Sequence, residues 1–189
     1  MNKLEIFFRY FIEYENYKIV LIGLRNTLVI AICGLLIGIV VGSVVAAFKV
    51  AGTRSRVAKA VSYVGDAYTG IFRGTPIIVQ LIVFHYVILR GSGINPLLEA
   101  VLVFGLNSGA YVAEIMRGGI LSVDVGQLEA GRTLGLSYGT TMLRVVIPQA
   151  IKNVVPTLGN ELIALTKDTS VAGYVATMDL NAAFTAIAG

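Results

Sequence analysis

Residues 27–48 read TLVIAICGLLIGIVVGSVVAAF, a run without a charged side chain. A helix of this length, rising about 1.5 Å per residue, crosses the roughly 30 Å hydrocarbon layer of a bilayer. Gly34, Gly38 and Gly42 recur within it at four-residue intervals. Small residues spaced in this way let a neighbouring helix approach closely. The run therefore predicts a membrane-spanning helix with a glycine face packed against another helix.

The whole chain has the composition of an integral membrane protein. Its 189 residues are 56% apolar and 14% charged, with a mean hydropathy of +0.80, whereas soluble domains carry about a quarter charged residues. The net charge of +4 is expected of cytoplasmic loops and needs no nucleic-acid partner. Cys33 and His85 are each the only residue of their type, which excludes a disulfide framework and a cysteine-based metal site within the chain. We expect one transmembrane domain over residues 1–189.

Three further segments follow the first one, which we extend to residues 20–48. The segment at 61–90 is too long for one straight crossing, and Arg73-Gly74-Thr75-Pro76 interrupts it. A bend is expected there because proline removes a helical hydrogen bond. Segments 97–117 and 151–170 complete the set. Together they predict an all-α, polytopic transmembrane helical bundle.

The connection between the first two spans predicts the orientation of the chain. Residues 49–59 contain Lys49, Arg54, Arg56 and Lys59 and no acid. Short loops rich in lysine and arginine stay on the cytoplasmic side, so the N-terminus is expected outside. Residues 1–17 mix charges with apolar side chains and fit either a helix in the membrane interface or a frayed polar tail.

A polar stretch separates the third and fourth spans. Residues 127–148 read QLEAGRTLGLSYGTTMLRVVIP and contain no membrane-length hydrophobic block. A helix from Glu129 to Leu134, Gly135 at the position after its end and Ser137 as the next N-cap predict two short helices, the second ending before Pro148. Such a pair cannot form a pore wall in lipid. We expect a compact cytoplasmic element that contacts a partner.

Several groups of residues along the chain match the motifs of one family. Glu129-Ala130-Gly131, then Gly135, then Val145-Val146-Ile147-Pro148 are similar to a Glu-Ala-Ala, Gly, Ile-x-Leu-Pro pattern, with conservative departures at Gly131, Val145 and Ile147. The other matching groups are Arg73-Gly74-Thr75-Pro76 with Val79-Gln80, Ser108-Gly109-Ala110-Tyr111-Val112-Ala113-Glu114, and Asn160-Glu161 with Lys167-Asp168-Thr169-Ser170. Over about residues 27–183 the chain resembles the membrane-spanning permease subunit of a bacterial type I ABC importer, in the polar-amino-acid (histidine, arginine, glutamine, glutamate) branch.

The resemblance implies a type I importer permease fold in the bacterial inner (cytoplasmic) membrane, with a cytoplasmic coupling helix. It implies as partners separate ABC ATPase subunits, a second permease copy that is identical or paralogous, an extracytoplasmic solute-binding protein and membrane lipid. The matching coupling residues are Glu129, Ala130, Gly131, Gly135 and Pro148, and Glu129 would face a basic residue of the ATPase.

No Gly-x-x-x-x-Gly-Lys-Ser/Thr loop occurs in the chain, so it lacks the usual backbone nest for nucleotide phosphates. We expect no cofactor and no metal in this chain, ATP-Mg on the partner subunit, and no enzymatic activity of the chain itself.

Carboxylates of the fourth span are the first candidates for contact with a substrate. Glu161 and Asp168 lie seven residues apart and therefore on nearly the same helix face. They would attract an ammonium or guanidinium group, unless Lys167 neutralises one of them. Thr169 and Ser170 either donate to a substrate carboxylate or cap an interrupted helix end.

Other polar residues of the spans leave two interpretations open. Glu114 either lines the cavity or pairs with Arg117 one turn further on. Gln80 and Thr75 lie at the expected bend and are candidates for the cavity wall. His85 is expected to form a hydrogen bond within the bundle.

These features favour the permease subunit of an ATP-driven importer of polar, preferentially basic, amino acids, coupled to its ATPase through residues 127–148. The alternative from another class is an ion-coupled secondary transporter or channel that uses Glu114, Glu161 and Asp168; a membrane assembly protein is a third. Members of the family usually continue for one more span, so we expect a final span to be missing after residue 189.

Overall fold

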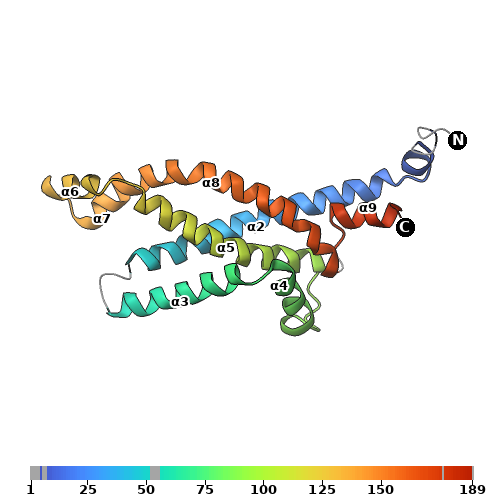
Figure 1. Cartoon of the computed structure of the whole chain (residues 1–189), viewed down its shortest axis with the longest axis horizontal. Helices are drawn as coiled ribbons and strands as arrows, with labels where there is room; N and C mark the ends of the chain where they lie inside the picture. The colour runs from blue at the N-terminus through green and yellow to red at the C-terminus, as the bar shows by residue number, and fades with distance from the viewer. Residues whose placement is uncertain (1–4, 6–7, 52–55, 176, 189) are drawn as a thin grey trace.

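The computed structural model describes residues 5, 8–51, 56–175 and 177–188, and all regular elements among them are helices. The predicted all-α fold is therefore confirmed. Helix α2 (Tyr17–Ala51) follows the short π turn η1 (Arg9–Glu13) and runs along the molecule, with the chain termini near one end and α6 and α7 at the other (Figure 1). The segment expected at 20–48 lies inside α2.

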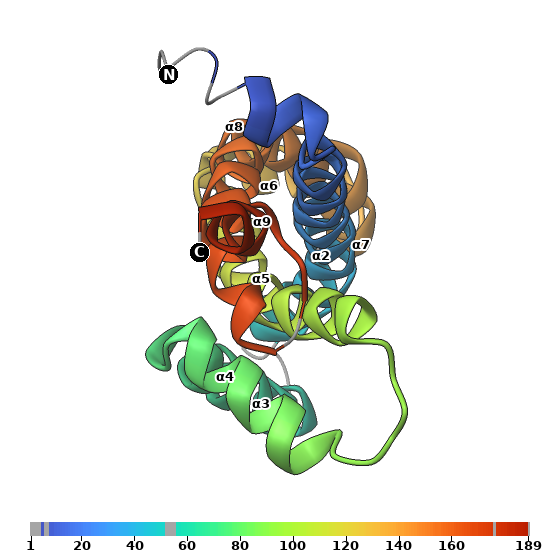
Figure 2. The same ribbon diagram turned by 90° about the vertical axis from the view of Figure 1, so that its right-hand side faces the viewer.

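The elements after α2 form a bent arm, a central helix, a short hairpin and a long returning helix. The arm is α3 with α4 and η2, α5 is the central helix, α6 and α7 make the hairpin, and η3 leads into α8. Seen along the long axis, α2, α5 and α8 lie together and the α3–α4 arm lies to one side (Figure 2). The bounds are α3 Arg56–Gly74, α4 Ile77–Val83, η2 Phe84–Ile88, α5 Pro96–Leu121, α6 Val125–Thr133, α7 Tyr138–Thr141, η3 Met142–Val146, α8 Ile147–Asp168, η4 Thr169–Val175 and α9 Leu180–Ala188.

The glycine face of α2 packs against α5. A Cβ atom built on Gly38 would lie 2.7 Å from the Ser108 hydroxyl oxygen, and one on Gly42 would lie 2.7 Å from Cβ of Val112. Larger residues at these positions would push the two helices apart. The predicted packing role of these glycines is confirmed.

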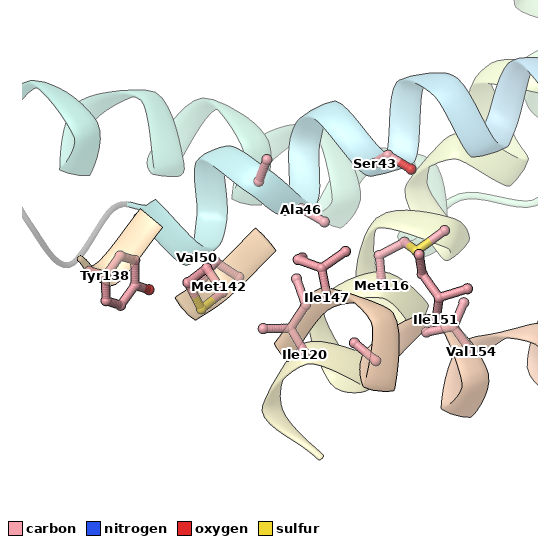
Figure 3. Close-up of a pocket in the computed structure, with 12 residues that line it drawn as sticks. Ser43, Ala46, Val50, Met116, Ile120, Tyr138, Met142, Ile147, Ile151 and Val154 are labelled. Carbon is pink, nitrogen blue, oxygen red and sulfur yellow. The ribbon is translucent and has the colours of Figure 1, made fainter. Parts of the chain in front are cut away.

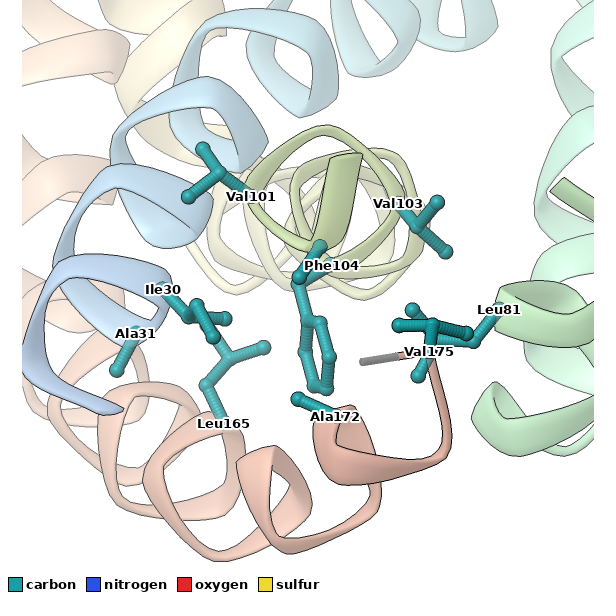
Figure 4. Packing of buried hydrophobic residues seen from close by; sticks show 10 residues of the cluster. Ile30, Ala31, Leu81, Val101, Val103, Phe104, Leu165, Ala172 and Val175 are labelled. Carbon is teal, nitrogen blue, oxygen red and sulfur yellow. The ribbon is translucent and has the colours of Figure 1, made fainter. Parts of the chain in front are cut away.

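The hydrophobic core lies where α2, α5 and the end of α8 meet. Phe104 of α5 is fully buried at its centre, with Ile30 of α2 and Leu165 of α8 on one side and Val175 of η4 on the other (Figure 4). Leu81 of α4 and Ala172 of η4 close the cluster from the other sides. The core therefore ties the bent arm and the end of α8 to the same part of α5.

The bend in the second hydrophobic segment lies at the predicted residues. The helical axis turns by 104° between residues 59–74 and 77–88, and Pro76, with ψ at 139°, is extended at the start of α4. Proline has no N–H, so the carbonyl of Phe72 loses its partner four residues on. Side-chain amides of Gln80 and Asn107 donate to that carbonyl instead, at 2.8 and 3.2 Å.

Among the described residues, fewer helices are long and apolar enough to cross a membrane than the four spans that the sequence predicts. By length and composition, α2 and α5 can cross a membrane, and the bent pair of α3 with α4 and η2 makes a third if it is one span. Helix α8 does not meet the same criterion within the described residues, because its exposed side carries polar and charged residues. The fourth span expected at 151–170 therefore stays a prediction, and α8 would need water or a partner on its polar side to cross a membrane.

Two helix ends also differ from the expectation. The second helix of the polar stretch does not stop before Pro148, because the chain stays helical from Tyr138 through the π turn η3 and into α8, where Pro148 is in the first turn. Proline needs no intrahelical donor in the first turn. Lys49 belongs to the last turn of α2 and is not in a loop; residues 52–55 lie outside the described residues.

Candidate functional site

The hairpin of α6 and α7 is a rigid corner built by local hydrogen bonds. The Asp124 carboxylate caps α6 by accepting from the N–H of Gly126 at 2.6 Å. At the other end Gly135 has φ of +81°, and the N–H of Leu136 donates to the carbonyl of Gly131 at 3.1 Å. This is a Schellman helix end, which favours glycine at the left-handed position. Ser137 then caps α7, so the corner and the cap that the sequence predicts are confirmed.

Gly131 is the point at which α6 closes onto α7. It is buried, and a Cβ atom there would overlap the methyl group of Thr141 and lie 2.8 Å from its hydroxyl oxygen. Thr141 is fully buried, and its hydroxyl donates to the carbonyl of Ser137 at 3.0 Å. Position 131 has glycine where the family pattern has alanine, and the structural reason is its close contact with the second short helix.

The outer surface of the hairpin is exposed. Glu129 and Ala130 both face solvent, and the Glu129 carboxylate forms no ion pair with another described residue. Leu134 at the corner is 81% exposed. An exposed apolar side chain beside an unpaired carboxylate is suited to contact with a partner protein.

An apolar cluster and an apolar cavity join the hairpin to the long helices. Val123, Val146 and Ala150 are buried together under the hairpin. Beside them lies a cavity of ≈ 380 Å³ between α2, α5, α7 and α8, in which Ser43 and Tyr138 supply the polar side chains (Figure 3). None of the candidate substrate residues lines this cavity.

The two carboxylates of α8 lie on one side of a continuous helix. Glu161 is half-buried and accepts a hydrogen bond from the Ser108 hydroxyl of α5 at 2.9 Å. Asp168 in the last turn is exposed, as is Lys167 beside it, and no ion pair between these two is present. The structure therefore brings Glu161 to α5 and leaves Asp168 open.

The residues that follow Asp168 have different surroundings. The α-helix ends there and a 3₁₀ turn begins, so the helix is interrupted where the sequence suggested. Thr169 is 2% exposed and its hydroxyl donates to the carbonyl of Thr166 at 2.8 Å. Thr169 thus lies in the core and does not belong to an open site, whereas Ser170 is exposed.

Gln80 and Thr75 hold the bend and do not line any of the described cavities. The amide nitrogen of Gln80 donates to the carbonyl and the hydroxyl of Thr75, at 3.0 and 2.9 Å, and its oxygen accepts from Asn107 at 3.1 Å. Thr75 donates to the carbonyl of Ile71 at 2.8 Å. Their polar groups satisfy the broken helix, and a role of these two residues in the cavity wall stays a prediction.

Glu114 is the centre of an ion cluster that joins three helices. It pairs with Arg117 at 2.9 Å, as one of the two interpretations predicted, and with Lys49 of α2. Lys49 also contacts Asp66 of α3 at 2.8 Å and donates to the Thr69 hydroxyl at 3.1 Å. The side chain of Lys49 is only 9% exposed.

Some of these partners could not be found in the sequence. The sequence placed Lys49 in a loop. It did not predict the contacts of Lys49 with Asp66 and Glu114, because these contacts depend on how three helices pack. The His85 imidazole contacts the buried carboxylate of Glu99 at 2.9 Å, which confirms the expected hydrogen bond within the bundle without the sequence having named its partner. Among the described residues, no group of three metal-ligating side chains is present.

The fold, with its membrane-length helices and a rigid hairpin at one end, defines a polytopic membrane protein that offers a docking surface beside its spans. The family model described as "Binding-protein-dependent transport system inner membrane component" matches residues 34–187. The chain belongs to this family. It is therefore a transport permease subunit of the membrane and not itself an enzyme.

Relatives and a solved structure agree with this family. The chain is 38% identical to the arginine transport system permease protein ArtQ of Bacillus subtilis, over 85% of this chain and 72% of the relative. It is 36% identical to a putative glutamine transport system permease protein GlnP of Rickettsia bellii, over 92% of this chain and 78% of the relative. A crystal structure of an amino acid ABC transporter with histidines has a TM-score of 0.81 and 33% identity, covering 93% of this chain and 87% of that one. The predicted type I importer permease fold is thereby confirmed.

Proposed function

We propose that the chain is the permease of an ATP-driven importer of polar amino acids, with a preference for basic ones. The relatives named for arginine and glutamine transport support the class of substrate. The carboxylates of α8 support the preference for a positive charge.

The observation that carries this proposal is the open polar side of α8. Asn153, Thr157, Asn160 and Asp168 are exposed along a helix that packs against the apolar helices α2 and α5. Polar side chains in a membrane need water or partners, and in transporters they line the path of the solute. Glu161 and Asp168 give this side two carboxylates, which would pair with an ammonium or guanidinium group.

The same proposal assigns the hairpin of α6 and α7 to an ABC ATPase. Glu129 would face a basic residue of that subunit, which holds ATP and Mg²⁺ in place of this chain. A second permease copy, identical or paralogous, would face the open side, and a solute-binding protein would dock at the end with the chain termini, which is then outside.

Uptake in reconstituted vesicles tests the function. The permease is incorporated with its ATPase, the solute-binding protein is added outside, and labelled arginine, histidine, glutamine and glutamate are compared with and without ATP. ATP-dependent uptake that favours arginine and histidine is expected. Uptake driven by a sodium or proton gradient without ATP would instead establish an ion-coupled transporter that uses Glu114, Glu161 and Asp168.

Replacing Asp168 by Asn tests the charge preference in the same vesicles. We expect the preference for basic over neutral amino acids to fall about tenfold, because one charge-assisted hydrogen bond of roughly 1.5 kcal/mol is weakened. Glu13→Gln, at an exposed position in η1, is the matched control. An unchanged preference in Asp168→Asn would remove this residue from the site.

A further inference from the structure

Arg73 stands apart from the other charged side chains in the interior of the hydrophobic segments. It lies in the last turn of α3, just before the bend, and is exposed. Its guanidinium lies over the ring of Tyr111 on α5, 5.3 Å from the ring centroid. None of the ion pairs among the described residues includes it. A guanidinium held by an aromatic ring and left without a carboxylate is free to bind an anion.

The depth of Arg73 makes this lack of a carboxylate partner significant. Helix α3 begins at Arg56, so Arg73 lies about 26 Å further along at roughly 1.5 Å per residue. It is therefore well inside the bent segment that can form a span. Charged side chains at such depth face water or a partner and mark the path of a solute more often than they serve packing.

A polar pocket lies beside Arg73, which is one of its lining residues. It has a volume of ≈ 450 Å³ and is lined by α2, α3 and α5, within the range of about 300–1,000 Å³ for small-molecule sites. On the α3 side, Ser62, Asp66 and Arg73 lie on one helix face; α2 and α5 contribute the ion cluster of Lys49, Glu114 and Arg117.

The charges that line this pocket do not cancel. Lys49 and Arg117 are bound to Asp66 and Glu114 within the ion cluster. With Arg73 included, three basic and two acidic side chains line the pocket, so its net charge is +1. The pocket is thus prepared for one anionic group, and the planar fork of a guanidinium suits a carboxylate or a phosphate.

The pocket adjoins a second polar cavity, which reaches α8. Glu114 also lines a neighbouring cavity of ≈ 460 Å³, together with Asn153 and Thr157 of α8. Polar surface therefore extends from α8 to Arg73 through their shared lining residue, Glu114. Every α-amino acid carries both an ammonium and a carboxylate, and the two sides of this surface offer the opposite charges.

We infer that Arg73, held by Tyr111, binds the α-carboxylate of the amino acid in transit. This inference rests on the proposed function and adds a second, anionic contact to the cationic one at Glu161 and Asp168. It also explains how one permease could carry neutral as well as basic amino acids, since the α-carboxylate is common to both.

Binding to the purified permease–ATPase complex, without the solute-binding protein, tests the inference. Equilibrium dialysis compares labelled L-arginine with agmatine, which has the same guanidinium and amine but no carboxylate. We expect the wild type to bind arginine at least about tenfold more tightly than agmatine, as the loss of a charged hydrogen bond implies. Arg73→Gln should bind both equally, and Arg73→Lys should retain part of the difference.

Arg90→Gln is the matched control, because Arg90 is exposed and does not line the pocket. It should retain the wild-type ratio. Each variant is checked for assembly by size-exclusion chromatography and basal ATPase activity, and Arg73→Lys carries the test if Arg73→Gln does not assemble. Equal binding of arginine and agmatine by the wild type, or the wild-type ratio in both Arg73 variants, would overturn the inference.

A lipid phosphate is the other source of an oxyanion, and the lipid composition separates the two. The dialysis is repeated in nanodiscs of phosphatidylcholine with and without phosphatidylglycerol. If Arg73 holds a lipid headgroup, its replacement abolishes a stabilising effect of phosphatidylglycerol and leaves the arginine-to-agmatine ratio unchanged, which contradicts the inference.

The wild type could also import glutamine and not arginine. That result would refute the proposed preference for basic amino acids but not the carboxylate contact at Arg73, which is then tested with glutamine and its decarboxylated analogue 4-aminobutyramide.

Discussion

The corner between α6 and α7 and the bend between α3 and α4 are both breaks in a helical chain, but different contacts hold them. At the corner, Leu136 bonds to Gly131 and Thr140 to Ser137, all within a few residues. At the bend, Asn107 reaches Phe72 across 35 positions of the sequence. The hairpin is thus specified by its own residues, whereas the bend, which Pro76 locates, is also held by a contact with α5.

This difference fits the coupling role that we propose for the hairpin. A locally specified hairpin keeps its shape while a partner pushes or pulls it, so it can transmit force as one body. A bend and an ion cluster held by contacts between helices can change when those helices shift. Four substitutions test the comparison, beginning with the largest expected effect.

Glu129→Lys should abolish ATP-dependent uptake while the subunit still inserts and folds. The exposed carboxylate is expected to contact a base of the ATPase, and a repulsive charge at such an interface costs several kcal/mol, roughly 2–5. ATPase activity stimulated by the solute-binding protein and uptake are measured together. Glu13→Lys at the opposite end is the control, and full uptake in Glu129→Lys would refute the coupling role.

Lys49→Met should destabilise the helix bundle by roughly 3 kcal/mol, the low end for removing one partner of a buried pair, because Arg117 still neutralises Glu114. The free energy of unfolding in detergent is measured. Lys18→Met removes an exposed pair with Glu15 and should cost less than about 1 kcal/mol. Equal effects of both variants would show that the ion cluster contributes no more than a surface pair.

Gln80→Leu should cost about 2 kcal/mol and loosen the bend. The substitution leaves the carbonyls of Phe72 and Thr75 with fewer donors, and a buried polar group without a partner costs about 1–3 kcal/mol. Hydrogen exchange of the α4 amides should become faster. Gln149→Leu, at a half-buried side chain in the first turn of α8, should leave α4 unchanged; faster exchange in both would mean that the effect is not local to the bend.

Gly131→Ala should cost about 1 kcal/mol, because its methyl group presses on Thr141 and overpacking costs about 1–3 kcal/mol. Adding Thr141→Ala should restore stability by making room. Thermal unfolding of the single and double variants is compared. A double variant less stable than either single one would show that the two residues do not share this contact.

Local signals made much of the fold predictable. The first span, the bend at Pro76, the turn at Gly135 and the cap at Ser137 each depend on residues that are neighbours in the chain, and the structure has all four. The end of the second short helix was predicted wrongly, because Pro148 is tolerated in the first turn of a helix and did not stop it.

The candidate site was less predictable than the fold. Glu161 and Asp168 were recognisable as carboxylates of one helix face, but the hydroxyl of Ser108 that binds Glu161 belongs to another helix. Gln80 and Thr75 were recognised as polar residues at a bend, and their hydrogen bonds in the structure, to each other and from Asn107 to Gln80, show that they hold it. Thr169 looked accessible beside Asp168, yet it is in the core.

The sequence by itself determined that this protein is a helical membrane protein, where its chain bends, and the shape of its hairpin, because hydropathy, proline and helix caps act over a few residues. Only the tertiary structure decided which charges meet. Lys49 and Glu114 are 65 residues apart and pair because glycines let α2 and α5 pack closely. Arg73 keeps no such partner because α5 presents the ring of Tyr111 to it.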